Sequence, residues 1–148
     1  MKKALALLLS LSFLTLTAFA AAGKRGWDDN YARSLAEAKK ENKSVLLDFT
    51  GSDWCGYCIK IDEEVFSKAA FKNLAKDKLK LVELDFPQNK RLTRAVEQQN
   101  EKLQAQYKVN GYPTIILLDS EGREQTRWEG YNPDLVSELK TALEKSKR

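Results

Sequence analysis

The chain has 148 residues, the length of one ordinary domain, and its 43% hydrophobic and 31% charged residues suit a folded protein rather than a disordered one. It contains no histidine, which excludes His-based acid–base catalysis, His-containing triads and imidazole metal ligands. Its two cysteines, Cys55 and Cys58, are too few for a four-thiolate zinc or iron–sulfur site. The net charge is only +4 and no basic stripe with interleaved aromatic residues occurs, so we expect no nucleic-acid partner.

The N-terminal segment has the pattern of a secretory signal peptide. Two lysines give it a positive start, an apolar run follows, and small residues cluster from Ala18 to Ala22. Cleavage after Ala20 or Ala22 is expected, which predicts a signal peptide over 1–20 and one domain over 21–148. An uncleaved anchor helix is the alternative, but the apolar run is short for a bilayer span and carries hydroxyl side chains. We therefore expect export to the periplasm, where disulfides persist, with no stable membrane insertion after cleavage.

Apolar periodicity then predicts alternating helices and strands. In chain order these are a helix from an Asp28 or Asp29 cap to about Asn42, a buried strand over 44–50, a helix from Ile59 that continues or restarts near Phe71, a strand over 79–86, a helix over 92–107 with a possible break at 98–100, a strand over 114–118, a more polar edge strand over 123–128, and a last helix capped by Asn132 and opened by Pro133. This order predicts an α/β fold, with a central mixed sheet of about four strands and helices on both faces.

The two cysteines stand three positions apart, where a predicted strand gives way to a predicted helix. At a helix N-terminus, unpaired N–H groups and the helix dipole favour a thiolate, which is the attacking species. Cys55 would attack a partner's sulfur, and Cys58, one turn along, would resolve the mixed disulfide. Run backwards, the same chemistry donates a disulfide.

Two other interpretations of the cysteine pair remain. A metal clip for zinc or copper(I) would be two-coordinate at best, since the chain has no His and no Met beyond Met1. We therefore expect no metal and no other cofactor. A non-catalytic binding or chaperone module would use the groove around Tyr112 and would be indifferent to the state of the cysteines.

Three motifs, in this order along the chain, resemble the thioredoxin superfamily. They are Leu46-Leu47-Asp48-Phe49, Trp54-Cys55-Gly56-Tyr57-Cys58 and Gly111-Tyr112-Pro113-Thr114. The chain is similar to periplasmic thioredoxin-like oxidoreductases, close to the C-terminal domain of the transmembrane thiol:disulfide interchange protein. The resemblance covers nearly the whole mature chain and implies a thioredoxin-like fold.

The same resemblance implies roles for individual residues. Cys55 would be the exposed nucleophile and Cys58 the buried resolving thiol. Pro113 would be a cis-proline beside the pair, and Tyr112 would offer its backbone to an extended substrate segment. Trp54 would shield the pair and shape the contact surface.

Asp48 resembles the buried carboxylate that moves a proton for the resolving thiol, a role that a desolvated Asp with a raised pKa would suit. The alternative is a capped, solvated residue at the end of a strand. Tyr57, which we count among the substrate-binding residues, stands where several relatives have His or Pro. Its presence argues against a strong oxidant.

These residues together predict a monomeric thiol–disulfide oxidoreductase that reduces or isomerises protein disulfides, with disulfide donation as an alternative direction. Its expected partners are exported proteins that carry disulfides or thiols, and a membrane protein that supplies electrons.

Overall fold

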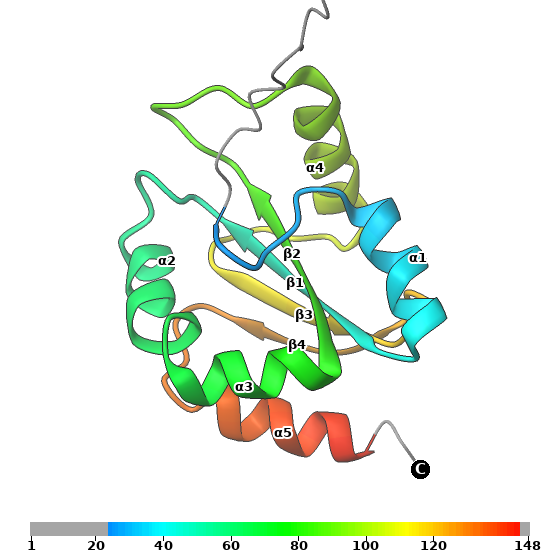
Figure 1. Ribbon diagram of the computed structural model, residues 1–148. Coiled ribbons are helices and arrows are strands. Elements are labelled where there is room, and N and C mark those ends of the chain that lie inside the picture. Colours follow the sequence, from blue (N-terminus) through cyan, green and yellow to red (C-terminus); the bar gives the residue numbers. More distant parts are fainter. Residues whose placement is uncertain (1–23, 146–148) are drawn as a thin grey trace, which may run out of the picture.

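The computed structural model describes residues 24–145, so the predicted signal peptide and its cleavage sites lie outside the described residues. Helices and strands alternate along the chain as Figure 1 shows. They are α1 (Tyr31–Glu41), β1 (Ser44–Thr50), α2 (Gly56–Ile61), the π-helix η1 (Asp62–Phe66), α3 (Ala69–Lys78), β2 (Leu79–Asp85), α4 (Arg94–Gln106), β3 (Thr114–Leu118), β4 (Glu124–Glu129) and α5 (Leu135–Lys145).

The four strands form one mixed sheet in the order β2-β1-β3-β4, which confirms the predicted α/β fold and puts the polar strand β4 at an edge. β1 and β2 run parallel, whereas β3 is antiparallel to both β1 and β4. In the parallel pair Asp48 lies opposite Glu83, and Thr50 lies opposite Asp85. The carboxyl ends of β1 and β2 therefore meet at the same edge of the sheet.

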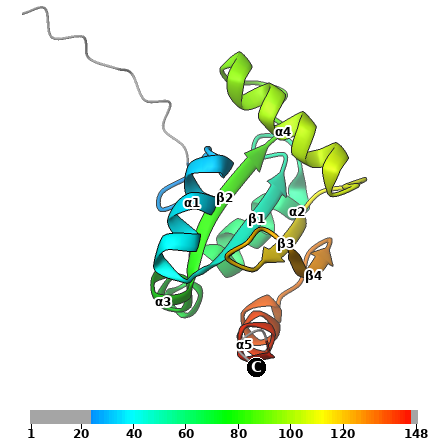
Figure 2. The same ribbon diagram turned by 90° about the vertical axis from the view of Figure 1, so that its right-hand side faces the viewer.

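Helices cover both faces of the sheet (Figures 1 and 2). Alternate side chains of a strand point to opposite faces. In β1, Val45, Leu47 and Phe49 pack with the buried residues of α1 and α4. Leu46 packs with those of α2, η1, α3 and α5. Asp48 has the same parity as Leu46, so it faces the layer that contains α2.

The first helix begins later than predicted. Its N-cap is Asn30, whose Oδ1 accepts the N–H of Arg33 at 2.9 Å, rather than Asp28 or Asp29. Asp28 is instead paired to the edge of β2. Its N–H donates to Leu81 O at 2.9 Å, and its carbonyl accepts the N–H of Glu83 at 2.9 Å. The helix cannot start until the chain leaves that bridge.

The predicted break at 98–100 does not occur, and α4 is continuous. The polar side chains there make contacts with other elements. Gln99 Oε1 accepts the N–H of Tyr31 at 3.0 Å, and Asn100 Nδ2 donates to Asp85 O at 2.9 Å. The polar residues that interrupt the apolar pattern of α4 are thus the ones that hydrogen-bond it to the start of α1 and the end of β2.

Two further boundaries follow from local hydrogen bonds. The helical segment after the cysteines runs from α2 into η1 and restarts as α3 at Ala69. The last helix begins at Leu135 rather than Pro133, because Asn132 Oδ1 first accepts the N–H of Asp134 at 2.9 Å in a turn. Within residues 24–145, none of the helices combines the length and the apolar character needed to cross a membrane.

Candidate active site

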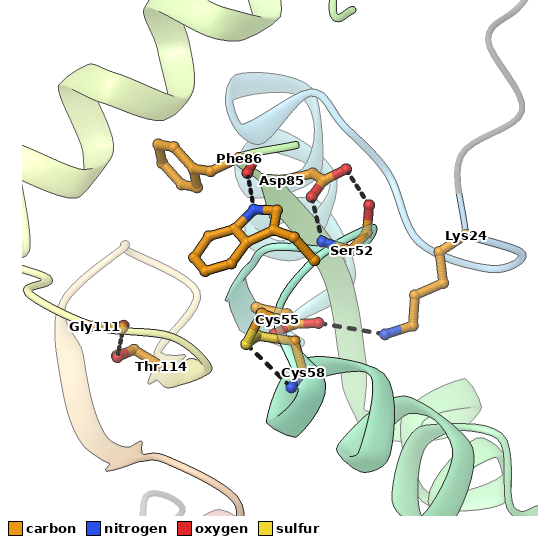
Figure 3. Close-up of a disulfide and its surroundings, with 10 residues drawn as sticks. Lys24, Ser52, Cys55, Cys58, Asp85, Phe86, Gly111 and Thr114 are labelled. Carbon is orange, nitrogen blue, oxygen red and sulfur yellow. Dashed lines mark hydrogen bonds and ion pairs between the residues drawn. A yellow bond between two sulfur atoms is a disulfide. The ribbon is translucent and has the colours of Figure 1, made fainter. Parts of the chain in front are cut away.

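A disulfide joins Cys55 and Cys58 at the start of α2, with the Cα atoms 5.2 Å apart (Figure 3). Cys55 is the N-cap of the helix, and its Sγ accepts the N–H of Cys58 at 3.3 Å. Cys55 is 8% exposed and Cys58 only 2%, so Cys55 is the less buried of the two residues. When the pair is reduced, the same N–H can stabilise a thiolate on Cys55.

The loop that leads into Cys55 is held by the end of β2. Ser52 donates from its N–H to Asp85 Oδ1 at 2.9 Å and from its hydroxyl to Asp85 Oδ2 at 2.7 Å. Trp54 Nε1 donates to Phe86 O at 2.8 Å. Because these acceptors belong to the strand beside β1 and to the residue that follows it, the sheet sets the position of the loop that carries Cys55.

Aromatic rings gather around Trp54, the residue directly before Cys55. Trp54, 41% exposed, meets Tyr112 edge to face, with ring centroids 6.0 Å apart. Tyr112 also stacks on Phe86 at 5.1 Å, and its hydroxyl accepts from Gln104 Nε2 at 2.6 Å. The indole needs Gly51 beneath it, since a Cβ there would lie 2.5 Å from the ring.

The Tyr112–Pro113 peptide bond is cis. The loop around it is braced on both sides, because Pro113 O accepts the N–H of Gly130 at 2.8 Å and Thr114 Oγ1 donates to Gly111 O at 2.8 Å. Figure 3 shows Gly111 and Thr114 to the left of the disulfide and Lys24 to its right. A hollow of about 300 Å³ opens at this loop, lined by Asn110, Gly111, Tyr112, Pro113, Thr114, Glu129 and Gly130.

Tyr57 has different neighbours from Trp54. Its side chain is 66% exposed, and its ring stacks on Tyr131 with centroids 6.5 Å apart. Lys60 Nζ lies 4.4 Å from the centre of the Tyr131 ring. The structure therefore brings Trp54 together with Tyr112, and places Tyr57 in a separate aromatic contact.

Asp48 is 1% exposed in the middle of β1, so the alternative of a solvated residue at a strand end is wrong. Its Oδ2 accepts from Lys24 Nζ at 3.3 Å, whereas its Oδ1 has no hydrogen-bond partner among residues 24–145. Burial raises the pKa of the Asp48 carboxyl, and the nearby Lys24 ammonium opposes that rise. A buried oxygen with a free lone pair is equipped to accept a proton.

Sequence patterns did not predict the charged residues around Asp48. Lys24 Nζ lies 2.6 Å from Asp62 Oδ1. Burial raises the pKa of Glu83, which stands opposite Asp48 on β2. A signal was available in Glu83, an acidic residue that follows the apolar pair Leu81-Val82 in β2. Within 24–145, no group of three or more His, Cys, Asp and Glu side chains could hold a metal ion. A cavity of about 130 Å³ here is lined by Lys24, Thr50, Ser52, Cys58, Ile59, Asp62, Glu63 and Glu83.

Comparisons with known proteins agree with this geometry. Residues 31–147 match the family described as the thioredoxin-like domain. The chain is 39% identical over 127 residues to the disulfide bond reductase DsbH of Chlamydia pneumoniae, a match that covers 83% of this chain and 75% of that protein. It is 31% identical over 93 residues to the thiol:disulfide interchange protein DsbD of a Pseudomonas species, covering 63% of this chain and only 14% of that protein.

Among solved structures, that of a DsbH oxidoreductase superposes with a TM-score of 0.74 at 37% identity, covering 91% of this chain and 95% of that one. The chain therefore belongs to the thioredoxin-like domain family, among its thiol–disulfide oxidoreductases.

Proposed function

We propose that the protein is exported to the periplasm, loses the signal peptide over 1–20, and there reduces disulfides in other proteins. One observation carries the proposal: a Cys55–Cys58 disulfide at a helix start, with Cys55 the more exposed sulfur. The reducing direction is supported by the 39% identity to a protein named disulfide bond reductase.

In the first step the Cys55 thiolate attacks one sulfur of a substrate disulfide. A bond forms between Cys55 Sγ and that sulfur, the substrate S–S bond breaks, and the second substrate sulfur leaves as a thiolate. The N–H of Cys58, 3.3 Å from Cys55 Sγ in the disulfide, supports the charge before the attack.

In the second step Cys58 resolves the mixed disulfide. The Cys58 thiol gives its proton to Asp48, and the resulting thiolate attacks Cys55 Sγ. The Cys55–substrate bond breaks, the substrate leaves as a thiolate, and the Cys55–Cys58 disulfide of the structure is the product. Two electrons have passed from the dithiol to the substrate. The burial of Asp48 and the free lone pair on Oδ1 support its role as the base.

The rings and the hollow near the disulfide suit an extended substrate segment. The substrate would lie along the Tyr112–Pro113 loop, where the hollow of about 300 Å³ opens. Trp54 would contact it on the Tyr112 side, and the largely exposed Tyr57 would contact a different part of it. Exposed aromatic rings of this kind contribute strongly to protein contacts.

The test uses reduced protein and a disulfide-bonded protein substrate. We expect the wild type to reduce the substrate, Cys55→Ala to be inactive, and Cys58→Ala to accumulate a mixed disulfide with the substrate, detected by mass spectrometry. Full activity in both single variants would contradict the proposal.

The direction of electron flow has its own test. Equilibration of the pair against glutathione buffers gives its reduction potential. A potential well below that of glutathione supports a reductase that draws electrons from a membrane thiol partner. A potential well above it would make the protein a disulfide donor instead.

A further inference from the structure

The segment before α1 is fixed against the layer of the protein that contains α2. Trp27 packs on Phe66 and Phe71, with ring centroids 5.0 and 6.1 Å apart. The backbone N–H of Trp27 donates to Lys24 O at 3.0 Å, which closes a turn. Asp28 then bridges to β2 through two backbone hydrogen bonds. The backbone at Lys24 is therefore held in place by aromatic packing on one side and by the sheet edge beyond it.

The Lys24 side chain extends from that turn toward the disulfide (Figure 3). Its ammonium nitrogen lies 2.6 Å from Asp62 Oδ1 and 3.3 Å from Asp48 Oδ2. It also lies 4.2 Å from the ring centres of both Trp27 and Phe66. The side chain is only 16% exposed, so its charge is weakly screened by water.

Asp48 is buried and has two acidic side chains near it, Asp62 and Asp85, and both conditions disfavour its ionised form. Without a nearby cation, burial and like charges would both keep Asp48 protonated and unable to act as a base. The charges that act on Asp48 come from Lys24 before α1, Asp62 on η1 and Asp85 on β2, which is itself paired with Lys90 at 2.8 Å. Its register partners are Glu83 on β2 and the uncharged Ile115 on β3. Cys58 on α2 lines the cavity that Lys24, Asp62 and Glu83 also line.

We propose that Lys24 is a positioning residue for the resolving step, whose ammonium favours the ionised form of Asp48, the form that can take the proton of Cys58. The inference rests on the proposed function, in which Cys58 resolves the mixed disulfide. Lys24 Nζ contacts Asp48, and Lys24 and Cys58 line the same cavity of about 130 Å³.

The step balances without any further reactant. The S–H bond of Cys58 breaks and an O–H bond forms on Asp48, while the electron pair stays on Cys58 Sγ. That pair forms the bond to Cys55 Sγ, and the substrate sulfur leaves with the electrons of the bond it loses. Lys24 keeps its proton throughout and acts only through its charge.

Stopped-flow kinetics with a small aromatic disulfide, which releases a coloured thiolate at each step, tests the inference. The first thiolate reports attack by Cys55, and the second reports resolution by Cys58. In Lys24→Met we expect the acid limb of the second phase to move up by about 1 pH unit or more, since an adjacent opposite charge lowers a carboxyl pKa by that much. At pH values below the limb, resolution should slow by about tenfold for each pH unit that the limb moves.

Two variants complete the design. Lys24→Arg keeps the charge and should keep the wild-type profile. Lys80→Met is the matched control, because Lys80 also bridges two carboxylates, at 3.0 and 2.7 Å, and is 21% exposed. Its profile should coincide with the wild type.

If Lys24→Met does not fold, Asp62→Asn still tests the inference, because it should move the acid limb of the second phase in the opposite direction. Asp62 is 47% exposed, so Asp62→Asn should fold, and loss of its negative charge should move the acid limb to lower pH. Second-phase profiles identical to the wild type in both Lys24→Met and Asp62→Asn would overturn the inference while leaving the reductase intact. Absence of both phases in the wild type would instead overturn the proposed function.

Discussion

The two sides of the disulfide differ in almost every physical property. On the side of Cys58, Lys24 and Asp48 are largely buried and charged, and the local cavity holds about 130 Å³. Around Cys55, Trp54 and Tyr57 are exposed rings, and Trp54 contacts Tyr112, which lines a hollow of about 300 Å³. In the proposed function this difference corresponds to a division of work, in which the proton of Cys58 is taken up on the charged side and the protein substrate is contacted on the aromatic side.

The most direct way to break this division is Asp48→Asn. The amide cannot accept the Cys58 proton, so we expect resolution at neutral pH to slow by at least about 100-fold, the usual contribution of a general base. Attack by Cys55 should be unchanged, because its thiolate is supported by the N–H of Cys58. The two phases of the aromatic disulfide assay measure both steps, and equal slowing of both would contradict the division.

The same variant also tests the burial of the Asp48 charge, through the pH dependence of the free energy of unfolding. Burial raises the pKa of Asp48 above its unfolded value, near 3.8, so the folded state binds the proton more tightly than the unfolded state does. The wild type should therefore lose free energy of unfolding as the pH rises from about 4 through the raised pKa. Asp48→Asn lacks this loss, so its free energy of unfolding relative to the wild type should increase as the pH rises through that range. Urea unfolding of the oxidised proteins at several pH values measures the gap, and a gap independent of pH would contradict the assignment.

On the aromatic side, Trp54→Ala should lower kcat/KM for a protein disulfide by about tenfold, or ~1.4 kcal/mol, because an exposed ring beside the nucleophile is lost. The rates of both phases with the small aromatic disulfide should fall by less than this, because the two Ser52–Asp85 hydrogen bonds still hold the loop. Tyr57→Ala is the comparison, and a smaller loss is expected because Tyr57 stacks on Tyr131 rather than on Tyr112. A loss with the small disulfide equal to that with the protein would contradict a contact role.

The smallest effect is expected for Ser52, in the loop that leads into Cys55, and it concerns the free energy of unfolding. Ser52→Ala removes the 2.7 Å hydrogen bond to the buried Asp85 and should lower the free energy of unfolding by about 1 kcal/mol. Ser67→Ala, which removes an exposed hydrogen bond to Glu63 O, is the control and should cost less than about 0.5 kcal/mol. Equal losses in the two variants would show that the Ser52–Asp85 contact has no special weight.

Local sequence patterns predicted the strands well, because buried strands carry short apolar runs. The strands over 44–50 and 114–118 have the predicted bounds. The cysteine pair was equally visible, since its chemistry depends on residues three positions apart. Helix starts were less predictable. Asp28 looks like a cap in sequence, but the sheet edge binds its backbone and its carboxylate pairs with Arg33.

Asp48 was predicted from the resemblance, but the charged partners around it could not be, because their contacts join distant parts of the chain. Lys24 appears in the sequence as part of a short polar lead, and its partner Asp48 lies 24 positions away. Asp85 meets Ser52 only because β1 and β2 pair in parallel with their carboxyl ends together. Such pairs are set by the topology of the sheet rather than by spacing.

The anchored turn at Lys24 has a consequence for where the catalytic unit begins. The family match starts at residue 31, the first residue of α1. A protein truncated at that boundary would retain both cysteines and every strand of the sheet. It would nevertheless uncover Phe66 and Phe71 and remove the cation beside Asp48. Under the proposed role of Lys24, residues 24–30 therefore belong to the catalytic unit although they precede the family match, and a protein that begins at residue 31 should resolve mixed disulfides more slowly.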